Sequence, residues 1–250
     1  MLYAADFRNK AAAALSGNWG KAVGVGFVAS LLGAATTFAG SGGGGGRDSS
    51  SDIESITDLN GVIPTEFQIA VLAFISILGF IAIAFAILHF IVGGAVTLGY
   101  VKFNLNLVDG KPASFADLFS EFHRFGTAFV MQLLRGLYTL LWSLLLIIPG
   151  IYASYGYAMT PYILLENPEM TANEAIAASK ELMDGNRWRL FCLEISFIGW
   201  ALLAALLTCG IGYLWVVPYQ EASFAAFYRE IKAEKYGREE KKETDDVFWN

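Results

Sequence analysis

The chain has 250 residues, of which 55% are hydrophobic and only 16% are charged. An average soluble domain is about 25% charged, so this composition, gathered into long apolar runs, excludes an ordinary soluble domain and indicates a polytopic membrane protein. The formal net charge of −6 comes largely from acids in residues 48–66 and 239–246, and we expect no nucleic acid as a partner.

The N-terminal part predicts a surface helix followed by a first span. In residues 3–16, Phe7, Ala11, Ala14 and Leu15 share one face, which is typical of an amphipathic helix in the membrane interface. Residues 19–39 are rich in glycine and alanine and predict a span that can approach a neighbouring helix closely. Residues 40–66 are polar and carry five consecutive glycines, which predicts a flexible extracellular loop. They lack the lysine of a phosphate-binding loop.

A second long apolar run covers residues 67–107. About 40 helical residues would extend roughly 60 Å, twice the thickness of a bilayer core. We predict one long span, about residues 67–105, broken at Gly93-Gly94, and a re-entrant hairpin is the alternative. After it, Ser114 and Asp117 have the spacing of a capping box, which predicts a second interfacial helix over residues 113–124.

The next apolar run, from Gly126 to Leu165, carries a single charge, Arg135. It is long enough to cross a bilayer twice, as spans over 127–148 and 150–166. We expect Pro149-Gly150 to end one helix and reverse the chain. Thr171 and Glu174 then form a second capping-box pattern, which predicts a third interfacial helix over 171–184.

Two further spans are predicted over residues 190–208 and 211–230. They bring the total to six, within one transmembrane domain over residues 1–232. Residues 233–250 form a charged tail. Cys192 and Cys209 lie in apolar runs without a CxxC neighbour, so we expect no disulfide.

An approximate threefold repeat connects these segments into three hairpins. Each unit has an amphipathic helix, an aromatic and basic anchor, an outward span and a returning span. The anchors are GNWGK at 17–21, FHRFG at 122–126 and GNRWR at 185–189. The alternative is that every interfacial helix simply needs an aromatic residue beside a cation at the level of the lipid headgroups.

The distribution of basic residues predicts the orientation. With six spans, fifteen of the seventeen Lys and Arg residues lie on one side, Arg47 lies opposite, and Arg135 lies within a span. Basic residues stay in the cytoplasm. We therefore expect both termini to be cytoplasmic, in a bacterial inner membrane.

Arg135 is the centre of a candidate intramembrane polar site. It lies roughly 13 Å into the bilayer, at 1.5 Å per residue, and an unpaired arginine there costs about 2.5–3.5 kcal/mol. Glu221 lies at a matching depth, Glu194 is shallower, and Gln132 is one turn away. These residues form either a structural ion pair or a polar pocket for an anionic group.

No catalytic pattern stands out in the sequence. The chain has only two histidines and contains no HExxH, GxSxG or phosphate-loop pattern, so we expect no catalytic residues, metal or cofactor. Isolated acids such as Glu194 identify no reaction.

Several motifs carry a resemblance to a known family. They are GNWGKA, LWSLLLIIPGIY, the stretch from MTPYILLENPEM to GNRWRLF, and CGIGYLWVVPY. In these segments the chain resembles the bacterial "domain of unknown function 975" integral membrane proteins. The resemblance implies a multi-spanning inner membrane protein and assigns no activity.

These patterns favour an all-α transmembrane bundle that acts as a non-enzymatic accessory or scaffold. The partners we expect are the lipid bilayer and either another membrane protein or a second copy of the chain. The alternative is a transporter or lipid- and anion-handling protein that uses the polar site around Arg135.

Overall fold

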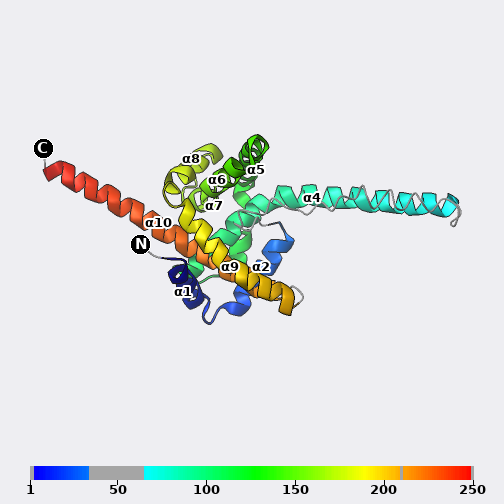
Figure 1. Ribbon diagram of the computed structural model, residues 1–250, viewed down its shortest axis with the longest axis horizontal. Helices are drawn as coiled ribbons and strands as arrows, with labels where there is room; N and C mark the ends of the chain where they lie inside the picture. Colours follow the sequence, from blue (N-terminus) through cyan, green and yellow to red (C-terminus); the bar gives the residue numbers. More distant parts are fainter. Residues whose placement is uncertain (1–2, 34–64, 209–210, 249–250) are drawn as a thin grey trace.

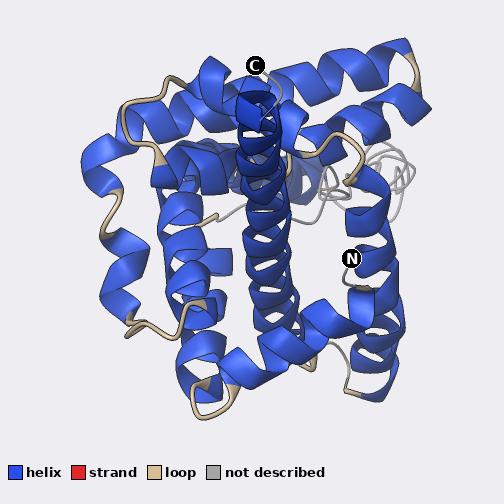
Figure 2. Ribbon diagram, turned by 90° about the vertical axis from the view of Figure 1, so that its left-hand side faces the viewer, coloured by secondary structure: helices blue, strands red, loops and turns tan. Residues whose placement is uncertain are grey.

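The structure is a computed structural model and describes residues 3–33, 65–208 and 211–248. Every regular element in these residues is a helix (Figure 2), which confirms the all-α prediction. Most of the loop predicted over 40–66 lies outside the described residues. The elements are α1 (Ala4–Leu15), α2 (Trp19–Leu31), α4 (Thr65–Val108), the 3-10 helices η1 (Phe115–Phe119) and η2 (Phe122–Arg124), α5 (Phe125–Leu145), α6 (Ile147–Gly156), α7 (Thr160–Glu166), α8 (Ala172–Leu182), α9 (Arg187–Leu207) and α10 (Tyr213–Phe248).

The core lies where the C-terminal half of α4 meets α7 and α10. Tyr100 and Phe103 from α4, Tyr162 from α7 and Tyr228 from α10 are all buried. Tyr162 and Tyr228 stack with their ring centroids 5.0 Å apart. Because aromatic side chains bury the largest apolar areas of any residue type, these rings dominate the packing between the three helices.

Two helices project from this core at opposite ends (Figure 1). The first part of α4, residues 69–90, is apolar and almost entirely exposed. At 1.5 Å per residue its 22 residues extend about 33 Å, close to the thickness of a bilayer core. At the other end, α10 continues into the charged tail and is helical as far as Phe248.

Three stretches of the described chain are long and apolar enough to cross a membrane. They are Ile69–Val108, Phe115–Leu145 and Arg187–Leu207. Helix α2 is also apolar but has only 13 residues, and Gly33 beyond it has a φ of +88°. The six-span arrangement therefore stays a prediction.

The long helix predicted from the second apolar run is present as α4, an uninterrupted α-helix of 44 residues. Gly93 and Gly94 do not break it. They are points of close approach instead, because a Cβ on Gly93 would lie 2.2 Å from the Gly33 carbonyl oxygen and one on Gly94 would lie 2.6 Å from that of Ala128. These glycines let the residues that follow α2, and helix α5, contact the backbone of α4.

The prediction that Pro149-Gly150 reverses the chain is wrong. The reversal lies at Leu146, whose backbone is extended (φ −161°, ψ 142°) between α5 and α6. Pro149 lies in the first turn of α6, where a missing N–H leaves no helical hydrogen bond unmade. A Cβ on Gly150 would lie 2.2 Å from Ser143 Oγ, so this glycine permits close packing of α5 on α6.

Two predicted helices are divided. The returning segment predicted over 150–166 is α6 and α7, separated by a turn at residues 157–159. The interfacial helix predicted over 113–124 is the pair of short 3-10 helices η1 and η2. Its predicted start is correct, since the Ser114 N–H donates to Asp117 Oδ2 at 2.9 Å.

The amphipathic helix predicted after Thr171 is α8. Its capping box is formed, with the Glu174 N–H donating to Thr171 Oγ1 and the Thr171 N–H donating to Glu174 Oε2. These bonds satisfy two amide groups that a helix start leaves free. The buried face of α8 consists of Ala172, Ala175, Ile176, Ser179 and Leu182.

The first and third anchors have the same backbone geometry. Gly17 and Gly185 have φ values of +80° and +74°, a conformation that glycine adopts without steric cost. In each case the next residue donates its N–H three residues back, Asn18 to Leu15 at 2.9 Å and Asn186 to Met183 at 3.0 Å. The second anchor has no glycine at this place.

Candidate functional site

The structure places Arg135 of α5 near Glu221 of α10. The Arg135 guanidinium interacts electrostatically with the Glu221 carboxylate and with Tyr162 of α7. Glu221 is only 3% exposed, and its charge also acts on Tyr100 of α4. A charged cluster therefore lies where the core helices meet, and the opposite charges of Arg135 and Glu221 offset each other.

Two polar atoms that lack a hydrogen-bond partner among the described residues lie on α5 and α4. Gln132, one turn before Arg135, donates from Nε2 to the Phe90 carbonyl oxygen at 3.4 Å. Its Oε1 and Asn104 Oδ1 are buried atoms without a hydrogen-bond partner among the residues described. Since a buried polar group without a partner costs free energy, these two acceptors are places where a water molecule or a ligand donor would bind favourably.

Glu194 has a different environment from the one expected. It lies on α9, is 7% exposed, and its Oε2 accepts a hydrogen bond from the Tyr155 hydroxyl of α6. Its contact thus connects α9 to the α5–α6 hairpin. Of the four residues proposed for the polar site, Arg135 and Glu221 interact electrostatically with each other, Gln132 lies beside them on α5, and Glu194 bonds to Tyr155.

The described residues contain no group of three or more His, Cys, Asp or Glu side chains that could hold a metal ion. The Arg135 cluster has one cation, one carboxylate, tyrosine hydroxyls and amide groups. This chemistry can hold a helix bundle together or accept a small polar or anionic group.

A second ionic cluster lies at the charged end of the core. Arg229 of α10 donates from Nε and Nη2 to the two carboxylate oxygens of Asp109, at 2.8 and 2.6 Å. Its Nη1 donates to Glu166. Glu166 also accepts from Lys232 and, at 2.5 Å, from the Tyr228 hydroxyl. We call these five residues the Glu166 cluster.

The Glu166 cluster connects α4, α7 and α10. Asp109 follows α4, Glu166 ends α7, and Arg229 lies within α10. Sequence reasoning missed it because the partners are 63 and 120 residues apart. The available signal was an acidic residue at or just after the end of two apolar segments, together with arginine and lysine in a third.

Further ion pairs join two of the short helices, α1 and α8, to α10. We call α1, η1, η2 and α8 the collar. Lys10 of α1 pairs with Glu230 at 2.9 Å, and Glu181 of α8 pairs with Lys235 at 2.7 Å. Exposed pairs contribute little each, about 0–1 kcal/mol. Their effect here is to join α1 and α8 of the collar to the charged part of α10.

The Glu166 cluster makes stability dependent on pH. Burial alone would raise the pKa of the Glu166 carboxyl. The hydrogen bonds from Lys232 and Tyr228 and the charge of Arg229 outweigh burial, so the pKa lies below its usual range. Glu166 is the last residue of α7, at the charged end of the core, and lies outside the three stretches that are long enough to cross a membrane.

We therefore expect Glu166→Gln to lower stability by about 2 kcal/mol at pH 7. A lowered folded-state pKa gives stability that is fully present above the unfolded-state pKa of about 4.3 and lost as pH falls through the folded value. The difference in melting temperature between wild type and variant should shrink below about pH 5. A difference that is constant from pH 7 to pH 3, or one shared by Glu169→Gln at an exposed site, would contradict this assignment.

These features define an all-helical protein with one apolar end and one ion-paired end. Residues 144–235 match the model of the family described as Protein of unknown function (DUF975). The match confirms the family predicted from the sequence motifs over this part of the chain. Comparison with curated proteins and with solved structures found no match.

Proposed function

We propose that this chain is a multi-pass protein of the bacterial inner membrane that acts as a scaffold or accessory without catalysis of its own. In this proposal α2 and α4, α5 and α6–α7, and α9 and α10 form three hairpins and six spans. Both termini and the collar lie in the cytoplasm.

The observation that carries the proposal is the separation of apolar and charged surface. Exposed apolar side chains gather on α4 before residue 91, at the α5–α6 reversal and at the end of α9, where Leu144, Ile148 and Leu206 are 79–83% exposed. The ion pairs of the collar and of the Glu166 cluster lie around the charged part of α10. Apolar surface of this extent is stable in lipid. The ion-paired surface around α10 is polar and suits contact with another protein.

The shared geometry of Gly17 and Gly185 supports the hairpin repeat. Each glycine lies between an amphipathic helix and an apolar one, so two of the three units turn from the interface into the span in the same way. The contacts of α5 with α6, of α9 with α10 and of α2 with α4 are consistent with paired spans.

Labelling with a membrane-impermeant thiol reagent tests the topology. Single cysteines at Ser50 and Asn250 would be introduced after replacement of Cys192 and Cys209 by alanine. In intact cells Ser50→Cys should react, and Asn250→Cys should react only after permeabilisation. Equal labelling of both positions would contradict the proposed topology.

A second candidate function is transport or binding of a small anionic group at Arg135. It is favoured by the Arg135 guanidinium, which would hold the anion, and by the acceptor oxygens of Gln132 and Asn104, which lack partners among the described residues and would receive donor groups of the same ligand. Replacement by Arg135→Leu separates the two functions. A folded variant that loses ligand binding or transport supports the second candidate, whereas a variant that fails to assemble supports a structural pair.

A further inference from the structure

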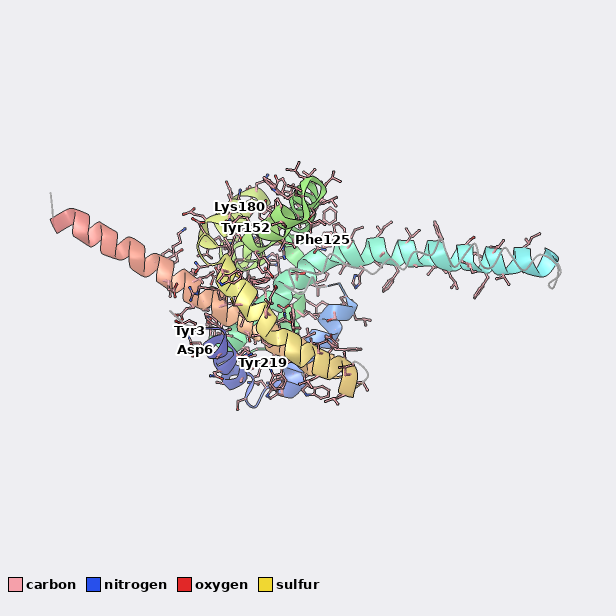
Figure 3. The ribbon with its side chains drawn as sticks, in the orientation of Figure 1. Tyr3, Asp6, Phe125, Tyr152, Lys180 and Tyr219 are labelled. Carbon is pink, nitrogen blue, oxygen red and sulfur yellow. The ribbon has the colours of Figure 1, made fainter. Side chains whose placement is uncertain are left out.

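A cavity of about 270 Å³ lies outside the polar site, between the α5–α6 hairpin and the start of α9. Its walls include Trp142 from α5, Pro149, Tyr152 and Tyr157 from α6 and its end, Lys180 from α8, and Arg187 from α9. Figure 3 shows Lys180 and Tyr152 near each other on this side of the molecule. The cavity is too small for a whole phospholipid and large enough for a headgroup.

One end of the cavity is cationic. Arg187 lies over the Tyr152 ring, with Cζ 4.0 Å from the ring centroid. Arg187 Nε is buried and has no hydrogen-bond partner in the described part of the chain. Lys180 supplies a second cation, and no carboxylate is among the lining residues. The cavity wall therefore carries two cations and no acid, and one cation, Arg187, has a buried N–H without a partner among the described residues. Such an environment favours an anion.

Gly156 keeps this end open. A Cβ at Gly156 would lie 3.4 Å from Arg187 Nη2, so a larger side chain would occupy the space in front of the guanidinium. The Gly156 carbonyl oxygen accepts a hydrogen bond from Ser179 Oγ at 2.8 Å. This bond joins α6 to α8 and holds the two walls together.

The other end of the cavity is apolar and open to the hairpin surface. Trp142, on its wall, is 46% exposed. Leu145 and Ile148, at the reversal of the hairpin, are also exposed. Pro149 and Gly156 are seven residues apart on α6, about 10 Å, so a ligand here would have a charged group at one end and an apolar group at the other.

We infer that the cavity binds the phosphate of an anionic phospholipid, with its acyl chains along the exposed surface of α5 and α6. In membrane proteins, aromatic residues beside cations lie at the level of the lipid headgroups. Lys and Arg attract the anionic lipids of the cytoplasmic leaflet. A phospholipid accounts for both the cations at one end of the cavity and the exposed apolar side chains at the other. A soluble phosphate would account only for the cations. The inference rests on the proposed insertion into a membrane.

Native mass spectrometry of the full chain with phosphatidylglycerol and phosphatidylcholine tests the inference. Wild type should retain phosphatidylglycerol in preference to phosphatidylcholine. The Lys180→Gln/Arg187→Gln variant should bind phosphatidylglycerol about 25-fold more weakly, because each cation contributes about fivefold. Lys111→Gln, at an exposed cation elsewhere, should bind as wild type does.

Three outcomes would overturn the inference. They are equal retention of both lipids by wild type, unchanged binding by the double variant, and displacement of the lipid by 10 mM inorganic phosphate, which would assign the cavity to a soluble anion. If the double variant is unfolded by circular dichroism, Lys180→Gln alone, at an exposed site, should still weaken binding about fivefold. If the protein proves to be membrane-inserted but shows no lipid preference, only this inference fails.

Discussion

Replacing Gly99 with alanine is expected to destabilise the protein by about 3 kcal/mol. A Cβ at Gly99 would lie 2.1 Å from the Leu118 carbonyl oxygen and 2.8 Å from that of Asp117. Both atoms belong to the backbone of η1, so no side-chain rotation can relieve the overlap. The variant must move η1 away from α4, which opens the buried packing around Leu118.

Gly79→Ala is the matched control, because Gly79 lies in the same helix and a Cβ there would meet no atom within 4 Å. Alanine favours a helix over glycine by up to about 1 kcal/mol, so this variant should melt at or above the wild-type temperature. The melting temperatures of both variants are measured in detergent by thermal unfolding monitored with circular dichroism. A Gly99→Ala protein that melts with wild type would show that η1 does not lie against α4 as described.

Replacing Glu221 with leucine is expected to cost about 3 kcal/mol, because it leaves the half-buried Arg135 guanidinium charged without the carboxylate that acts on it. Arg135→Leu should have an effect of the same order, since Glu221 is then the uncompensated charge. The Arg135→Leu/Glu221→Leu double variant should lose less than the sum of the two, by about 1–3 kcal/mol.

Unfolding measurements on the four proteins give this coupling directly. Lys10→Met, which breaks an exposed pair with Glu230, is the control and should cost less than about 1 kcal/mol. Strictly additive effects of the two core substitutions would show that Arg135 and Glu221 do not interact, and would remove the structural basis of the candidate polar site.

Local patterns in the sequence predicted local structure well. The hydroxyl and carboxylate spacing at Thr171–Glu174 and at Ser114–Asp117 identified both capping boxes, because a cap depends only on residues three apart. The periodicity of apolar residues identified α1 and α8. The composition of the long runs identified α4 and α5 as helices of membrane length.

Features that depend on contacts between helices were not predictable. Proline and glycine at 149–150 suggested a turn, but the chain reverses at Leu146, and the glycine serves the contact with Ser143. The sequence pattern could not distinguish a glycine that turns the chain from one that lets two helices approach. The pairing of Asp109 and Glu166 with Arg229 likewise depends on the order in which the returning segments pack.

The depth of α4 tests the central claim most directly. In a background without native cysteines, a nitroxide label would be placed at Ile81, in the exposed apolar part of α4, and at Tyr236, in the charged part of α10, with the protein in lipid vesicles. The label at Ile81 should collide more often with dissolved oxygen than with a water-soluble nickel chelate, and the label at Tyr236 should show the reverse. Ready access of the nickel chelate to Ile81 would contradict insertion of this helix into the bilayer.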